Sequence, residues 1–129
     1  MDEYDLIFED AGDLRSTESG SRYMNMHLVQ TIHDCEASCE HMTHHIKMQP
    51  DFQARMSQAT ILRECADICC LTAKILARGA ADEKQTAQLC VKICRVCGLE
   101  CAKFSDRMSQ ECSKTCLNCA KECGDFVNR

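Results

Sequence analysis

The sequence predicts an all-α fold, an antiparallel four-helix bundle whose core is lined with cysteine. Three observations predict it: the 129 residues contain a single proline, long stretches repeat apolar and cysteine residues at spacings of three and four, and only short breaks separate those stretches. An all-β domain is disfavoured because strands need more aromatic and β-branched residues than this chain has, and its aromatic fraction is 5%.

The chain divides into two predicted parts. Residues 1–22 are acidic and form a tail or a short docked helix, and residues 23–129 form the bundle. The predicted helices of the bundle span residues 23–48, 52–78, 82–103 and 107–123. Helices of about 17 to 27 residues with short connections are typical of an up-down-up-down bundle.

Residues that start or stop helices mark the breaks. Pro50 cannot continue a helix, and Asp51 after it can begin the next. Gly79 is the predicted stop of the second helix. Asp106 provides a cap for the fourth helix, and Gly124 is its predicted stop.

Twelve of the thirteen cysteines form six pairs with a spacing of four. The pairs are Cys35 and Cys39, Cys65 and Cys69, Cys90 and Cys94, Cys97 and Cys101, Cys112 and Cys116, and Cys119 and Cys123. Each helical residue turns the chain by about 100°, so residues four, seven and eleven apart share one face. Each of the last two predicted helices therefore has a continuous stripe of four sulfurs. Cys70 falls about 140° from its stripe and is predicted to lie outside the core.

The inward face of the first two helices continues with residues that lack a thiol, among them Thr31, Ile61 and Thr72. Folding the helices back on one another predicts that Met42 and Met108 lie beyond the last cysteines at one end. One cysteine of each helix is expected at a similar height, namely Cys35, Cys65, Cys97 and Cys112. The interior is predicted to be a tube of thiols with methionine at one end.

Several kinds of chemistry use many cysteines. Packing alone explains twelve in phase poorly, because valine, alanine and leucine fill a core without the risk of oxidation. Disulfides remain open, although the odd number of cysteines does not suit complete pairing and bridges four apart on one helix are strained. Zinc and iron–sulfur sites usually use cysteines two apart on tight loops, and no such loop is predicted.

Copper(I) fits the pattern best because it is a soft ion that thiolates and thioethers bind. Charge supports the same ion. Twelve buried thiolates need counter-charge, which about one monovalent ion per thiolate supplies, whereas three zinc ions would leave about six negative charges buried. The sequence therefore predicts multiple copper(I) ions per chain.

Composition excludes other classes. No stretch approaches the about 18 apolar residues of a membrane span, and a net charge of −5 disfavours nucleic acid as a partner. The acidic N-terminus has neither a basic secretory start nor adjacent arginines, so a cytoplasmic location is expected unless an export signal was removed. No nucleophile set or phosphate loop is recognisable, and an enzyme is not expected.

Several segments resemble the copper storage proteins, a family of cysteine-rich four-helix bundles, over about residues 24–126. The segments are Cys65-Ala-Asp-Ile-Cys69 with its continuation to Gly79, Cys90-Val-Lys-Ile-Cys94-Arg-Val-Cys97-Gly-Leu-Glu-Cys101 and Cys112-Ser-Lys-Thr-Cys116-Leu-Asn-Cys119-Ala-Lys-Glu-Cys123. The resemblance implies inward cysteines that store many copper(I) ions, a homotetramer, and access for the ion at a bundle end lined by histidine and methionine.

The first helix departs from the richer family pattern, because it has one cysteine pair followed by His41, Met42, His44 and His45. We expect Met42, Met108 and His45 to form the copper entrance, and the twelve paired cysteines to bind roughly a dozen ions. The alternative is a thiol redox protein or an iron–sulfur or zinc-binding protein. A redox enzyme needs an exposed thiol of low pKa at a helix start, which the mid-helix stripes do not provide.

Overall fold

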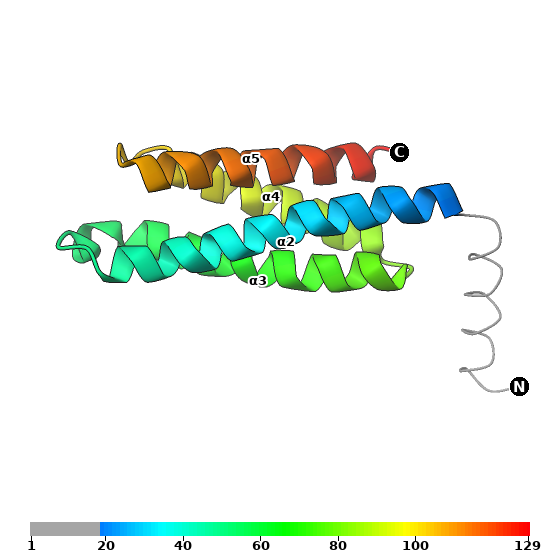
Figure 1. Cartoon of the computed structure of the whole chain (residues 1–129), viewed down its shortest axis with the longest axis horizontal. Coiled ribbons are helices and arrows are strands. Elements are labelled where there is room, and N and C mark those ends of the chain that lie inside the picture. The colour runs from blue at the N-terminus through cyan, green and yellow to red at the C-terminus, as the bar shows by residue number, and fades with distance from the viewer. Residues whose placement is uncertain (1–18) are drawn as a thin grey trace, which may run out of the picture.

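The fold, given by a computed structural model, is an antiparallel bundle of four helices, as predicted (Figure 1). The structure describes residues 19–129, with side-chain surroundings from residue 25 onwards. Its helices are α2 (Ser19–Lys47), α3 (Met56–Arg78), α4 (Glu83–Cys101) and α5 (Arg107–Val127). The described residues contain no strand, and none of their helices is long and apolar enough to cross a membrane. The predicted tail lies outside this range as far as residue 18.

Several helix ends differ from the predicted ones. The helix α2 begins at Ser19 rather than at residue 23. The helix α3 begins at Met56 rather than at residue 52, because Phe52–Arg55 form the short 3-10 helix η1 after Pro50. The helix α4 begins at Glu83 and ends at Cys101, one and two residues inside its predicted limits.

Two glycines predicted to stop helices behave differently. Gly79 ends α3 as predicted, with a positive φ of 65° that glycine adopts without strain. Gly124 does not end α5, which continues to Val127, so that prediction was wrong. The continuation buries Phe126, which outweighs the helix penalty of about 1 kcal/mol for glycine.

A third glycine brings α4 and α5 close together. A Cβ atom on Gly98 would lie 2.7 Å from Cγ of Leu117, so a larger residue would push the helices apart. The hydroxyl of Ser113 donates a hydrogen bond of 2.7 Å to the carbonyl of Gly98. This contact fixes the spacing between the two helices that each provide four cysteines to the core.

The two ends of the bundle are built from different residues. The end with the α3–α4 turn and the C-terminus, called here the apolar end, has Leu28, Leu76, Ala87 and Phe126 buried. The end with the α2–α3 connection and the α4–α5 turn, called here the charged end, has Asp51, Arg55, Phe104 and Asp106. In Figure 1 the charged end lies on the left and the apolar end on the right.

Candidate metal site

The core between the helices is made largely of sulfur. All twelve paired cysteines are buried, and Cys112 is the most exposed of them at 3%. We call these twelve residues the sulfur core. Cys70 lies outside it and is half-buried, as predicted. The helical spacing of four places the sulfurs of each helix on its inward face.

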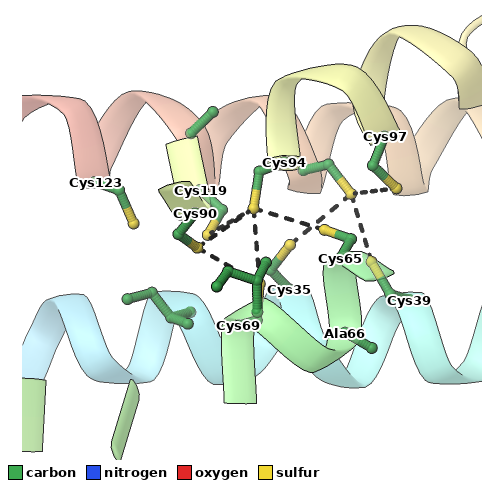
Figure 2. Packing of buried hydrophobic residues seen from close by; sticks show 14 of the residues in the cluster. Cys35, Cys39, Cys65, Ala66, Cys69, Cys90, Cys94, Cys97, Cys119 and Cys123 are labelled. Carbon is green, nitrogen blue, oxygen red and sulfur yellow. Dashed lines mark hydrogen bonds between the residues drawn. The ribbon is translucent and has the colours of Figure 1, made fainter. Parts of the chain in front are cut away.

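Cys94 lies at the centre of one group of sulfurs. Its Sγ atom is 3.6 Å from Sγ of Cys65 and 3.7 Å from those of Cys69 and Cys90. The Sγ atom of Cys119 lies 3.8 Å away. Figure 2 shows these side chains pointing toward one another from α3, α4 and α5.

Cys116 lies at the centre of a neighbouring group. Its Sγ atom is 3.6 Å from that of Cys39, 3.7 Å from that of Cys97 and 3.8 Å from that of Cys35. Such distances are far longer than the about 2.05 Å of a disulfide bond, and all the cysteines are free thiols. Disulfides are therefore not part of this fold.

Three groups of cysteines are compact enough to hold a metal ion, since the sulfur atoms within each lie within 4.8 Å of one another. The groups are Cys35, Cys69, Cys94 and Cys119; Cys35, Cys39, Cys65 and Cys116; and Cys90, Cys119 and Cys123. A metal–sulfur bond of about 2.3 Å places two thiolates on opposite sides of an ion about 4.6 Å apart. The sulfur positions therefore need little movement to receive soft ions.

Cys112 does not lie at the height predicted for it. Cys35 instead lies opposite Cys116, four residues further along α5, with the two Sγ atoms 3.8 Å apart, so the predicted layer was wrong by about one helical turn. The reason is helical rise, about 1.5 Å per residue. The four residues from Cys112 to Cys116 rise about 6 Å along α5, which is about one turn.

Burial opposes the ionisation of the thiols, although hydrogen bonds between them lower the pKa of some, such as Cys35 and Cys97. The pKa of Cys116 is raised above its ordinary value, first by its hydrogen bond with Cys112 and further by burial. The pKa of Cys101 is raised by hydrogen bonds with Cys112 and Cys97 and by burial, while a hydrogen bond with Gln58 opposes the rise. Because the thiolate is the form that binds a metal ion, metal binding to these cysteines releases protons.

The three predicted entrance residues belong to the charged end of the bundle. Met42 and His45 lie in the last two turns of α2, and Met108 lies in the first turn of α5. Met42 is buried, whereas Met108 and His45 are half-buried. The structure thus gives the end of the sulfur core a buried thioether and two partly accessible side chains that bind soft ions.

Sequence reasoning missed a polar group at this same end. Arg55 is buried at 8% exposure, and Gln58 and Ser109 are fully buried. The amide of Gln58 donates to the hydroxyl of Ser109 over 3.0 Å. For Arg55 the only sequence signal was the spacing of four from Asp51, which suits an ion pair but does not predict burial.

A four-helix bundle with a continuous core of free thiols defines a protein that can hold many soft metal ions. The family model described as copper storage protein matches residues 21–128. The chain belongs to the copper storage protein family.

Similar proteins agree with this assignment. The chain is 30% identical to the Cu(I)-bound copper storage protein BsCsp3 of Bacillus, with a TM-score of 0.76, and the match covers 81% of this chain and 98% of that one. It is 34% identical over 76 residues to the cysteine-rich protein YhjQ of Bacillus subtilis, 58% of this chain and 69% of that protein. The copper storage protein Ccsp of Streptomyces lividans, 21% identical, has the same fold, with a TM-score of 0.81 over 90% of this chain and 96% of that one.

Proposed function

We propose that this protein stores copper(I), holding multiple ions per chain on the thiolates of the sulfur core. The observation that carries the proposal is the continuity of that core, in which sulfur atoms from all four helices lie 3.6–4.0 Å apart without disulfides. One isolated metal site would need three or four of these residues. Twelve provide room for many ions that share ligands.

Charge favours copper(I) over zinc. Each copper(I) ion that replaces about one thiol proton leaves the buried core neutral. Zinc bound by four thiolates leaves a net charge of about −2 at each site, which is costly in a buried core. The relative BsCsp3 holds Cu(I), which supports the same ion for this chain.

We propose that all twelve cysteines of the sulfur core are copper ligands, and that Met42, Met108 and His45 form the entrance. Their thioether and imidazole groups bind a soft ion reversibly, and they lie where α2 ends and α5 begins. A catalytic role is not proposed, because the thiols of the sulfur core lack the exposure of a reactive cysteine.

The wider setting is also proposed. A related protein is described as a cytosolic copper storage protein, which supports a cytoplasmic location for this one. We propose a homotetramer, because Leu71 on α3 and Leu89 and Val96 on α4 are about half exposed and can be covered by a second copy.

The proposed function is tested by titrating the reduced protein with copper(I) under anaerobic conditions, against a competing chelator and with zinc in parallel. We expect tight uptake of roughly twelve copper ions per chain, with little zinc bound. Saturation at one to three ions or a preference for zinc contradicts copper storage and favours a structural metal site. A reversible two-electron oxidation of the metal-free protein without copper uptake favours the redox alternative.

Two cysteine variants make the titration residue-specific. Cys116→Ser removes the sulfur at the centre of one group, and we expect it to lower the capacity by about one to two ions while the helices remain formed. Cys70→Ser is the matched control because Cys70 lies outside the sulfur core, and it should leave the capacity unchanged. Equal losses in the two variants contradict the assignment of the ligands.

A further inference from the structure

Arg55 is a buried cation that contacts both chain connections at the charged end of the bundle. Its Nε donates to Oδ2 of Asp51 over 2.9 Å, and its Nη2 donates to Oδ1 of Asp106 over 2.9 Å. The guanidinium also lies 4.8 Å from the centre of the Phe104 ring. Asp51 belongs to the α2–α3 connection and Asp106 to the α4–α5 turn, so one side chain joins the two connections across this end.

A buried polar layer lies between Arg55 and the thiols. Nη1 of Arg55 donates to the hydroxyl of Ser109 over 3.4 Å, and Ser109 also accepts a hydrogen bond of 3.0 Å from Nε2 of Gln58. The side chain of Gln58 also acts on the thiol of Cys101, whose pKa it lowers. Arg55, Ser109 and Gln58 therefore form a continuous hydrogen-bonded chain that ends beside the sulfur core.

Two features show that this polar layer is incomplete. Oε1 of Gln58 is buried without a hydrogen-bond partner, a condition that costs about 1–3 kcal/mol in a folded protein. Cys112, the most exposed thiol of the sulfur core, lies in the second turn of α5 beside this layer. At the charged end, polar side chains that lack some of their hydrogen-bond partners thus reach the thiols. At the apolar end, hydrocarbon side chains cover the sulfur core.

We propose that Arg55 controls the rate at which copper(I) passes between solvent and the sulfur core, by covering the polar layer of Ser109 and Gln58 with a fixed positive charge. The inference rests on the proposed storage of copper(I). A copper ion or its chelator reaches Cys101 and Cys112 only when the guanidinium leaves Asp51 and Asp106. Arg55 provides no sulfur, so it sets the exchange rate and not the number of ions.

The test loads the protein with copper(I), mixes it with excess anionic copper(I) chelator and follows release in a stopped-flow instrument. Arg55→Gln removes the charge and both ion pairs, and we expect release to accelerate about tenfold or more. Asp51→Asn, at the exposed side of the pair, removes one partner and should accelerate release about threefold. If Arg55→Gln does not fold, the release rate is measured in Asp51→Asn and in Arg55→Lys instead. The lysine variant keeps the charge but not the forked geometry of the guanidinium.

A matched control shows whether the effect depends on where the positive charge is lost. Arg107 makes an exposed ion pair with Glu111 on the outer surface of α5, so Arg107→Gln removes the same charge and should leave the rate unchanged. Release from Arg55→Gln or from Asp51→Asn at the wild-type rate, or equal acceleration by Arg107→Gln, overturns the proposal. A wild-type protein that does not load copper contradicts the proposed function instead, and the two failures are therefore distinguishable.

A second control separates rate control from a general loss of stability. Leu76→Val weakens the core at the apolar end, and it should not accelerate release even where its unfolding midpoint falls as far as that of Arg55→Gln. Salt provides a further readout, because it weakens ion pairs. The ratio of release rates between Arg55→Gln and the wild type should therefore shrink as salt rises. A constant ratio, or an acceleration by Leu76→Val, assigns Arg55 to stability alone and overturns the proposal.

Discussion

At the apolar end of the bundle Leu76 and Phe126 are buried among hydrocarbon side chains, whereas at the charged end Arg55 is buried between two carboxylates and an aromatic ring. Both ends shield the same sulfur core from water. The interactions at the two ends differ in strength and in how much they depend on orientation. Hydrocarbon burial contributes about 25 cal/mol per Å² and does not depend on orientation, whereas an ion pair depends on geometry and can re-form with new partners.

This difference suggests a division of roles. A protein that stores an ion needs one end that stays closed for as long as the fold persists. It also needs a place where the interior can open without unfolding. Burial at the apolar end stabilises the whole bundle, because exposing Phe126 or Leu76 removes apolar area from the core. Breaking the contacts of Arg55 separates polar groups that water can solvate, whereas opening the apolar end exposes buried hydrocarbon.

The largest effect is expected from Phe126→Ala at the apolar end. The ring is 5% exposed, and its removal leaves a cavity at the end of α5. We expect the free energy of unfolding of the reduced, metal-free protein to fall by about 3 kcal/mol, measured by denaturant titration. Copper release from the loaded variant should change less than threefold. A small loss of stability together with fast release would assign the access route to the apolar end and reverse the comparison.

A smaller effect is expected from Asp106 at the charged end, which has two roles. Its Oδ2 accepts a hydrogen bond of 3.1 Å from the backbone N–H of Ser109, capping α5, and its Oδ1 accepts from Arg55. Asp106→Ala removes both and should lower the free energy of unfolding by about 2 kcal/mol, whereas Asp106→Asn keeps a cap and should lower it by about 1 kcal/mol. Equal losses in the two variants would show that the cap contributes nothing, and an unchanged Asp106→Asn would show that the ion pair contributes nothing.

The pH dependence of the same residue sharpens this test. Burial tends to raise the pKa of Asp106, but hydrogen bonds from Ser109 and Arg55 outweigh it and hold the pKa below its ordinary value. A carboxyl group with a lowered pKa stabilises the fold above its unfolded pKa of about 3.9, and this stabilisation is lost as pH falls through the folded pKa. The difference between the wild type and Asp106→Asn should therefore be full at pH 7 and shrink in acid below about pH 4.

The inward face of a helix was predicted more accurately where the helix contains more cysteines at helical spacing. The helices α4 and α5 have four cysteines each at offsets that define one face, and all eight are buried. The helices α2 and α3 have one pair each, so their faces were extended by periodicity alone. Thr31 and Ile61 were predicted to point inward, but they are half-buried while their neighbours Ile32 and Leu62 are fully buried.

The charged end could not be predicted because its contacts join residues far apart in the chain. Arg55 and Asp106 are 51 residues apart, and nothing local distinguishes Arg55 from an exposed residue on a solvated turn. Gln58 lies on the inward face at the helical spacing of the cysteines, seven residues before Cys65, which was the one available signal for its burial. Only the folded α4–α5 turn brings Phe104 and Asp106 beside Arg55.

The smallest effect is expected from Glu83, a carboxyl group near the apolar end whose surroundings are opposite to those of Asp106. Its Oε2 is buried without a hydrogen-bond partner, and desolvation raises its pKa above the ordinary value although Lys84 opposes the rise. A raised pKa means that the ionised carboxylate at pH 7 costs stability and that this cost disappears as pH falls below the unfolded pKa. Glu83→Gln should therefore raise the unfolding free energy at pH 7 by a few tenths of a kcal/mol, because the helix N-terminus, which favours a negative charge, offsets part of the gain. Denaturant titrations at pH 7 and pH 4 measure it, and the gain should vanish at pH 4. A loss of stability at pH 7 would show that the helix dipole outweighs desolvation, so that the carboxylates at both ends stabilise the bundle.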